Sequence, residues 1–518
     1  MSTGSEPEIR NVAAQGSVVA GMTLLSRISG FARDVLLSNF LGASFVADAF
    51  FVAFRIPNFF RRLFAEGAFN QAFVPVLSSF KTDSRLALLE FVSVMSGNLG
   101  AVLLLAVLIG VVGSPGLVAV FAPGFWQDPE RFDLTSDMVR ITFGYLGFVS
   151  LTAFCGALLN AHHRYALPAF TPVLLNISLI AAILFASSWF STPVFALAWG
   201  ILFAGLAQLL LQIPALSRLG LIVAPRVDFR HEGARKVGGL LVPAVFAASV
   251  GQINALIDTM LASTLVTGSI SWLYYSDRLF ELPIGLVAVA LGTVLLPNLS
   301  RLASEDDLNG FQATIDWGVR VGVVLGVPAA VALYVMALPL ISSIFMHGAL
   351  TEFDATMAAL SLEAFSAGLV PLVLVKVLAP AFFADQDTKT PFRIGVVAVV
   401  VNIVLNLLLF RVMGHVGLAL ATACAAWVNA MLLWRRLNSN NRYKVTRLTL
   451  LSMLRCLAAS VVMAAALTLL LPEPGMWIDA GIAERTLWLV SGVCGGALLY
   501  VGLLFVTGLR VEHLLHRV

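Results

Sequence analysis

The chain has 518 residues, of which 59% are hydrophobic and only 12% are charged, with a formal net charge of +3. Soluble globular chains carry about 25% charged residues, so this composition excludes an ordinary soluble domain. Apolar runs of about 20 residues recur along the chain, each long enough to cross a hydrocarbon core of about 30 Å, whereas strand alternation is absent. The sequence therefore predicts an all-α polytopic membrane protein.

Fourteen transmembrane helices are predicted, joined mostly by short loops. In chain order they cover residues 14–38, 45–79, 89–113, 136–160, 168–188, 193–216, 237–264, 271–300, 312–344, 355–383, 391–410, 415–434, 449–471 and 486–508. No loop is long enough to hold a catalytic domain, and no GxxxxGK[ST] phosphate-binding motif occurs. A transporter is expected, not an enzyme, and no cofactor is predicted apart from a candidate Na⁺ ion.

An internal repeat organises the first twelve predicted helices. Segment 73–78 resembles 295–300, segment 161–168 resembles 384–391, and Ala196-Leu197-Ala198 resembles Gly417-Leu418-Ala419, all at an offset near 222 residues. Six helices per half imply two lobes related by a pseudo-two-fold axis along the membrane normal. The predicted domains are therefore an N-lobe at 1–217, a C-lobe at 218–447, and two appended C-terminal helices at 448–518.

The loop charges predict the orientation. Loops on the side of both termini hold most of the loop arginines and lysines, whereas the opposite loops hold only Arg131, Arg411 and Arg485. The positive-inside rule then places both termini in the cytoplasm. The net charge is explained by this topology, so no nucleic-acid partner is expected.

Five arginines lie inside predicted helices, namely Arg27, Arg33, Arg61, Arg62 and Arg278. An arginine at the centre of a spanning helix costs about 2.5–3.5 kcal/mol on insertion scales. The simplest common explanation is a water-filled cavity that is lined with positive charge and binds an anion. A guanidinium fork can donate two hydrogen bonds to one oxyanion at once.

Further polar residues accompany these arginines. Asp48, Arg55 and Arg62 recur every seven residues and share a helix face, and Pro57 is expected to bend that helix. The predicted cavity and gating residues are Asp34, Asp48, Arg55, Asn58, Arg62, Glu66, Asp277 and Lys376. The alternative for each charge is a structural ion pair, such as Arg62 with Glu66, and Arg55 is the best candidate for a purely structural role.

Several segments resemble the MurJ (MviN) family of lipid II flippases. The resemblance rests on Ser26–Asp34, Asp48–Asn58, 61–69, 272–279 and 375–380, and it extends over essentially the whole chain. It implies the multidrug/oligosaccharidyl-lipid/polysaccharide exporter fold, alternating access, and a lipid-tail groove on the last two helices. The implied substrate is undecaprenyl-diphosphate that carries a disaccharide-pentapeptide, with Arg27, Arg33, Arg61 and Arg278 as headgroup ligands.

A second group of polar residues is a candidate Na⁺ site. Asp258, Asn402, Asn406 and Thr422 lie in predicted helices and offer carboxylate, amide and hydroxyl oxygens, which suit a hard cation. Some members of the family resembled are thought to hold sodium between these helices. The alternative is hydrogen bonding between helices, which polar residues in membrane spans commonly provide.

Three other functions are compatible with parts of the pattern. A flippase for another polyprenyl-diphosphate-linked oligosaccharide would need the same anion site. A cation-coupled drug antiporter of the same superfamily would favour carboxylates in the cavity and usually has twelve helices. A scaffold that contacts cell-wall synthesis enzymes would not require arginines inside the membrane.

Overall fold

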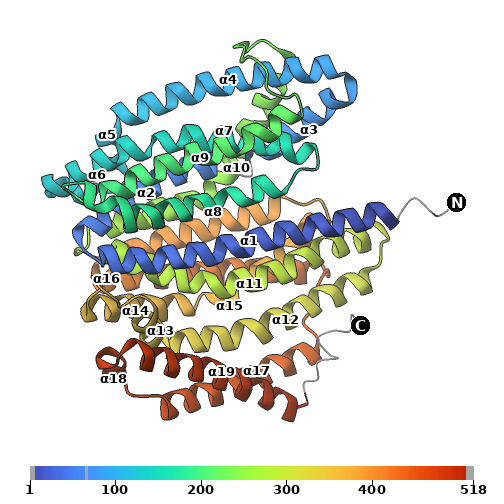
Figure 1. Cartoon of the computed structure of the whole chain (residues 1–518). Coiled ribbons are helices and arrows are strands. Elements are labelled where there is room, and N and C mark those ends of the chain that lie inside the picture. The colour runs from blue at the N-terminus through green and yellow to red at the C-terminus, as the bar shows by residue number, and fades with distance from the viewer. Residues whose placement is uncertain (1–5, 65–67, 509–518) are drawn as a thin grey trace. The chain divides into compact units, whose positions relative to one another are not determined.

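The structure, a computed structural model, describes residues 6–64 and 68–508 (Figure 1). Helices and their connections make up these ranges, with no strand among them. The helical fold class is therefore confirmed. Two compact units divide the chain at Thr264 and Leu265. The repeat predicted a boundary at 217/218, whereas the helix that follows this position packs with the N-terminal unit.

The N-terminal unit contains ten α-helices and three short helical segments within its described residues. They are α1 (Glu6–Leu41), α2 (Phe45–Phe64), α3 (Ala68–Asp83), α4 (Arg85–Val112), α5 (Ser114–Phe121), η1 (Pro123–Gln127), α6 (Pro129–Thr142), α7 (Gly144–Ala161), α8 (Ala166–Ala181), η2 (Ala182–Ala186), η3 (Ser187–Trp189), α9 (Phe195–Arg218) and α10 (Glu232–Ser263). Helices α7, α8 and α9 pack side by side, and α1 lies along α8. These four helices, with α2, surround the site described below.

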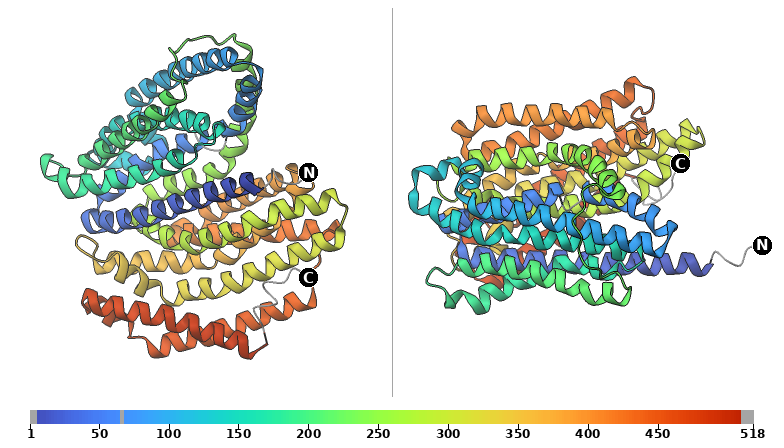
Figure 2. Two further views of the ribbon diagram at one scale, coloured as in Figure 1. Left: turned by 45° about the vertical axis from the view of Figure 1, so that its right-hand side comes forward. Right: turned by 90° about the horizontal axis from the view of Figure 1, so that it is seen from above.

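The C-terminal unit contains nine α-helices in the part that the structure describes. They are α11 (Ser269–Ser304), α12 (Leu308–Val335), α13 (Ala337–Ile344), α14 (Glu352–Ser366), α15 (Leu369–Ala384), α16 (Lys389–Ser439), α17 (Arg447–Leu470), α18 (Pro474–Asp479) and α19 (Ile482–Val506). Figure 2 shows α17 and α19 side by side, and α17 packs along α12. The predicted C-terminal pair is thus attached to the unit through α12.

Most predicted helices occur within a few residues of their expected ends, but several are broken. The predicted span 45–79 consists of α2 and α3, 312–344 breaks at Met336, and 355–383 breaks after α14. Conversely, α16 covers two predicted spans and bends at Gly414, whose φ of 57° and ψ of −135° are not helical. Glycine tolerates this positive φ because it has no Cβ atom.

Nine helices or helix pairs in the described residues are long and apolar enough to cross a membrane. The predicted number of fourteen is not reached by this criterion. One reason is that α16 merges two predicted spans. Another is that α2 carries Asp48, Arg55, Arg61 and Arg62 within its 20 residues, so its composition is too polar.

An extended connection crosses the surface of α4 before α10 begins. The backbone N–H of Arg226 donates to the carbonyl oxygen of Ser93 at 2.9 Å, and Asn98 exchanges two hydrogen bonds of 2.8 Å with the backbone of Asp228. Gly97 permits this contact, because a Cβ atom there would lie 2.3 Å from the carbonyl oxygen of Arg226. The connection between α9 and α10 is therefore docked on α4.

Candidate functional site: a polar cavity in the N-terminal unit

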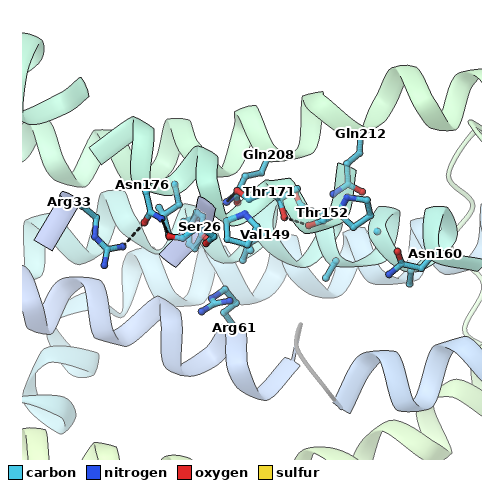
Figure 3. Close-up of a pocket in the computed structure, with 17 residues that line it drawn as sticks. Ser26, Arg33, Arg61, Val149, Thr152, Asn160, Thr171, Asn176, Gln208 and Gln212 are labelled. Carbon is cyan, nitrogen blue, oxygen red and sulfur yellow. Dashed lines mark hydrogen bonds between the residues drawn. The ribbon is translucent and has the colours of Figure 1, made fainter. Parts of the chain in front are cut away.

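A cavity of about 310 Å³ lies inside the N-terminal unit, between α1, α2, α7, α8 and α9 (Figure 3). Two of the predicted ligand arginines, Arg33 and Arg61, line it. The other polar lining residues are Ser26, Tyr145, Thr152, Asn160, Thr171, Asn176, Gln208 and Gln212. The cavity thus combines guanidinium groups with amides and hydroxyls, and no carboxylate lines it among the described residues.

Arg33 is held in place from two sides. Its Nε and Nη2 atoms donate to Oδ1 of Asp34 at 3.0 and 2.7 Å, and its Nη1 atom donates to Oδ1 of Asn176 at 2.9 Å. The guanidinium also lies over the ring of Phe54, 5.9 Å from its centroid. Arg33 is 7% exposed and Asp34 3% exposed. Asp34, predicted as a cavity charge, is therefore the ion-pair partner of Arg33.

Asn176 connects α8 to α1 at the point where Arg33 enters the cavity. Its Nδ2 atom donates to the carbonyl oxygen of Ser26 and to Oγ of Ser29, both at 3.0 Å, while its Oδ1 atom accepts from Arg33. Asn176 also packs against Gly30, where an added Cβ atom would lie at an ordinary contact distance of 3.4 Å from Nδ2. One amide thus fixes both the helix contact and the direction of the guanidinium.

Arg61 reaches the same cavity from α2 (Figure 3). Its Nε atom donates to Oδ1 of Asn58 at 3.0 Å, and Nδ2 of Asn58 donates to the carbonyl oxygen of Phe54 at 2.7 Å. The side chain of Asn58 is therefore oriented by its own helix and in turn orients Arg61. The predicted association of Asn58 with the cavity arginines acquires a physical basis in this contact.

Asp48 of α2 pairs with an arginine of α6. It is completely buried, and its Oδ2 atom accepts from Nη2 of Arg131 at 2.5 Å. Arg131, predicted to lie in a loop, lies in the first turn of α6. This helix begins at Pro129 after Asp128, whose carboxylate caps it by accepting from the Arg131 backbone N–H.

Arg485, also predicted in a loop, lies in the first turn of α19 and donates to the backbone carbonyl oxygens of Ser342 and Met346. The side of the membrane on which the two arginines lie stays a prediction.

Four further residues that were predicted to bind the anion or to gate the cavity do not line it, namely Arg27, Arg55, Arg62 and Lys376. Arg27, Arg62 and Lys376 have exposed side chains, and Arg55 donates from Nη1 to Oγ1 of Thr259 at 2.6 Å. Glu66 lies outside the described residues. For these positions a direct role in substrate binding or gating stays a prediction.

Arg278 and Asp277 lie on α11 of the C-terminal unit. Nη1 of Arg278 is 3.1 Å from Oε2 of Glu281, one helical turn away, and the guanidinium lies 4.8 Å from the centroid of the Tyr274 ring. These contacts hold the Arg278 side chain to its own helix. Its role as a headgroup ligand stays a prediction.

The candidate cation residues are divided between the two units. Asp258 belongs to α10, whereas Asn402, Asn406 and Thr422 belong to α16. Nδ2 of Asn406 donates to Oδ1 of Asn402 at 2.9 Å, and Nδ2 of Asn402 donates to Oγ1 of Thr422 at 3.3 Å. Hydrogen bonds thus bring the three residues on α16 together and link the two halves of this helix, and a bound cation stays a prediction.

Sequence reasoning missed Asn176, Gln212 and the lining role of Gln208. Each is a neutral polar residue in an otherwise apolar helix, and each is 5% exposed or less. That pattern was the available signal, because a buried amide requires hydrogen-bond partners. The arginines were identified from their charge, whereas the neutral amides could equally well have formed hydrogen bonds between helices.

The chain has close relatives among known proteins. A sequence profile described as "Lipid II flippase MurJ" matches residues 37–478. A Vibrio cholerae protein named "Probable lipid II flippase MurJ" is 43% identical over 507 residues, which cover 96% of this chain and 97% of the relative. A Haemophilus influenzae protein of the same name is 44% identical, covering 95% and 99%. Burkholderia cenocepacia "Lipid II flippase MurJ" is 38% identical, covering 96% and 98%.

Solved structures show the same relationship. A structure titled "Lipid II flippase MurJ, inward closed conformation" matches with a TM-score of 0.79 and 25% identity, covering 94% of this chain and 97% of that one. An inward-facing multidrug resistance MATE transporter of the MOP superfamily matches with a TM-score of 0.65 and 13% identity, covering 82% and 98%. The second likeness concerns the fold alone.

Proposed function

Since the chain belongs to the MurJ family of lipid II flippases, we propose that it moves undecaprenyl-diphosphate-linked disaccharide-pentapeptide across the bacterial inner membrane. The observation that carries this proposal within the molecule is the cavity that contains Arg33 and Arg61. Guanidinium groups donate in pairs to phosphate oxygens, and a cavity shielded from hydrocarbon is where such groups are stable in a membrane protein. Lipid II supplies the matching anion.

The transport direction proposed is from the cytoplasmic to the periplasmic leaflet, by alternating access. This direction supplies peptidoglycan synthesis outside the membrane. We further propose fourteen transmembrane helices in two six-helix lobes with two appended helices, and cytoplasmic termini. The loop charges and the repeat support this topology. The chain then acts as a transporter and not as an enzyme, and contacts with cell-wall synthesis enzymes are proposed only as additional interactions.

A Na⁺ ion is proposed as a coupling ion, held by Asp258, Asn402, Asn406 and Thr422. The clustering of the three α16 residues within hydrogen-bond distance supports this assignment. These side chains would supply neutral oxygen ligands, and Asp258 the one carboxylate. A bound ion would link conformational change to the sodium gradient.

The decisive experiment makes the chain the sole flippase of a cell. Native flippase is depleted, the chain is expressed, and lipid II is tested for cleavage by an enzyme added outside the inner membrane. Restored cleavage and growth are expected. Continued protection of lipid II despite normal membrane insertion would refute the function.

Two alternatives make different predictions in the same cells. A flippase for another polyprenyl-diphosphate oligosaccharide would leave lipid II protected but would expose that other lipid-linked glycan. A drug antiporter, for which the MATE-like fold is the specific observation, would lower drug accumulation without restoring growth.

A further inference from the structure

Gln208 and Gln212 line the cavity from a different helix than Arg33 and Arg61, the two arginines proposed to bind phosphate. They are 3% and 1% exposed, respectively, and both line the cavity from α9. Residues four apart in a helix project from the same face, so the two amides lie one turn apart along the cavity wall. In Figure 3, Gln212 lies on the side of the view away from Arg33, and Gln208 lies between them, above Arg61.

Both amide oxygens are buried acceptors without a donor. Among the described residues, Oε1 of Gln208 and Oε1 of Gln212 have no hydrogen-bond partner. The orientation of Gln208 is set by its Nε2 atom, which donates to the carbonyl oxygen of Thr171 at 2.8 Å. Buried polar atoms are nearly always paired, so two unpaired acceptors in one cavity point to a ligand that brings donors.

The neighbouring hydroxyl groups of Thr152 and Thr171 can also accept hydrogen bonds from a ligand. Oγ1 of Thr152 donates to the carbonyl oxygen of Phe148 and Oγ1 of Thr171 donates to that of Pro168, both at 2.8 Å. Since each hydroxyl has only one proton to donate, both present acceptor lone pairs to a ligand. The α9 side of the cavity wall and the two threonines therefore offer acceptors, whereas Arg33 and Arg61 offer donors from α1 and α2.

The wall beside Gln212 is also free of side-chain bulk. A Cβ atom added at Gly156 would lie 3.7 Å from Oε1 of Gln212 and 3.4 Å from Cβ of Pro168, which are ordinary contacts. A methyl group would thus fit without displacing the fold but would occupy the space in front of the amide. The native glycine leaves that space open to a ligand.

We propose that Gln208 and Gln212 form an uncharged subsite that accepts hydrogen bonds from amide N–H and hydroxyl groups of the sugar–peptide part of the substrate. The inference rests on the proposed function and extends it. A fully ionised diphosphate has only acceptors and suits the two arginines, whereas a glycopeptide carries many donors and suits the glutamine oxygens. The cavity therefore distinguishes a polyprenyl diphosphate with this headgroup from one without it.

The test compares two lipids on the purified full-length protein by native mass spectrometry. Lipid II carries phosphates and the glycopeptide, and undecaprenyl diphosphate carries only the phosphates. The variant Q208M/Q212M keeps side-chain length but removes both acceptors. It is expected to bind lipid II about tenfold more weakly than the native protein, because the two hydrogen bonds to the glycopeptide are lost. Its affinity for undecaprenyl diphosphate should stay within about twofold of the native value, because the arginines are unchanged.

Further variants separate the possible outcomes. Gly156→Ala is expected to weaken lipid II selectively, whereas R33A/R61A should weaken both lipids. Gln312→Met replaces a half-buried glutamine on α12 that donates to the carbonyl oxygen of Asn441; it is the matched control and should bind both lipids like the native protein. Its melting temperature provides the reference for folding.

The subsite is refuted if Q208M/Q212M and Gly156→Ala bind lipid II like the native protein, or if they weaken both lipids equally. In either case the proposed function stands as long as native protein binds lipid II and R33A/R61A does not. If native protein binds neither lipid, the proposed function fails and the subsite with it.

Discussion

Asp48 of α2 and Arg131 of α6 form a buried ion pair, with 2.5 Å between Oδ2 and Nη2. The guanidinium of Arg131 also lies 3.9 Å from the centroid of the Phe125 ring, so the pair is covered by an aromatic face. Charges taken out of water in this way depend on each other, because either one alone would be left without compensation. The pair joins two helices that are separated by more than 60 residues in the chain.

The variants Asp48→Ala and Arg131→Ala are each expected to destabilise the protein by about 3–5 kcal/mol, since each removes one partner of a buried ion pair. The matched control is Arg140→Ala on the same helix, whose pair with Asp137 is about half exposed. Such exposed pairs contribute about 0–1 kcal/mol. Melting of the purified protein, followed by size-exclusion chromatography after heating, measures the difference. Equal melting of Arg131→Ala and Arg140→Ala would contradict this account.

Asn176→Ala is expected to lower flipping about tenfold while the protein still inserts, because Arg33 loses the acceptor for Nη1 and α1 loses two bonds to α8. Externally cleavable lipid II in depleted cells is the measurement. Ser178→Ala serves as control, since Ser178 is on the same helix but donates to the carbonyl oxygen of Gly200. If Asn176 acts by positioning, undecaprenyl diphosphate binding of Asn176→Ala/Arg33→Ala should equal that of Arg33→Ala alone. Additive losses would show that the two residues act separately.

Arg278→Ala is expected to abolish flipping without removing the protein from the membrane, since this arginine is assigned to the diphosphate. Arg301→Ala on the same helix is the control, because its pair with Glu305 is more than half exposed on the arginine side. Growth of cells with each variant as sole copy and immunodetection in membranes provide the two measurements. Normal growth of the Arg278 variant would remove this residue from the site.

Gly97→Ala is expected to detach the connection between α9 and α10 from α4, because its Cβ atom would lie 2.3 Å from a backbone oxygen that cannot move away alone. Gly100→Ala on the same helix meets nothing within 4 Å and is the control. Trypsin cleavage after Arg226 in inside-out vesicles should be faster in the Gly97 variant only. Equal cleavage rates would show that the docked connection does not depend on Gly97.

Replacement of Na⁺ by K⁺ is expected to slow flipping and to lower the melting temperature of the native protein, since a ligand that binds only the folded state stabilises it. Asn402→Ala should melt at the same temperature in both ions. If neither the flipping rate nor the melting temperature of the native protein depended on sodium, the cation site would be refuted.

The sequence alone was sufficient for the class of protein and for the family resemblance. Runs of about 20 apolar residues leave few structural options in a membrane, because backbone groups must be satisfied within helices. Arginines in those runs are costly, so their presence predicted a sheltered site, and two of the four proposed ligands, Arg33 and Arg61, do line a cavity.

Only the tertiary structure showed which side chains pair with the charged residues of α2. Seven-residue spacing placed Asp48 on a face with Arg55, but it could not identify Arg131 as a partner of Asp48 or Thr259 as a partner of Arg55. Helical periodicity specifies which side of a helix a residue occupies, but not which helix lies opposite. For the same reason the neutral amides Asn176, Gln208 and Gln212 gained meaning only when packing of α1, α7, α8 and α9 brought them around one cavity.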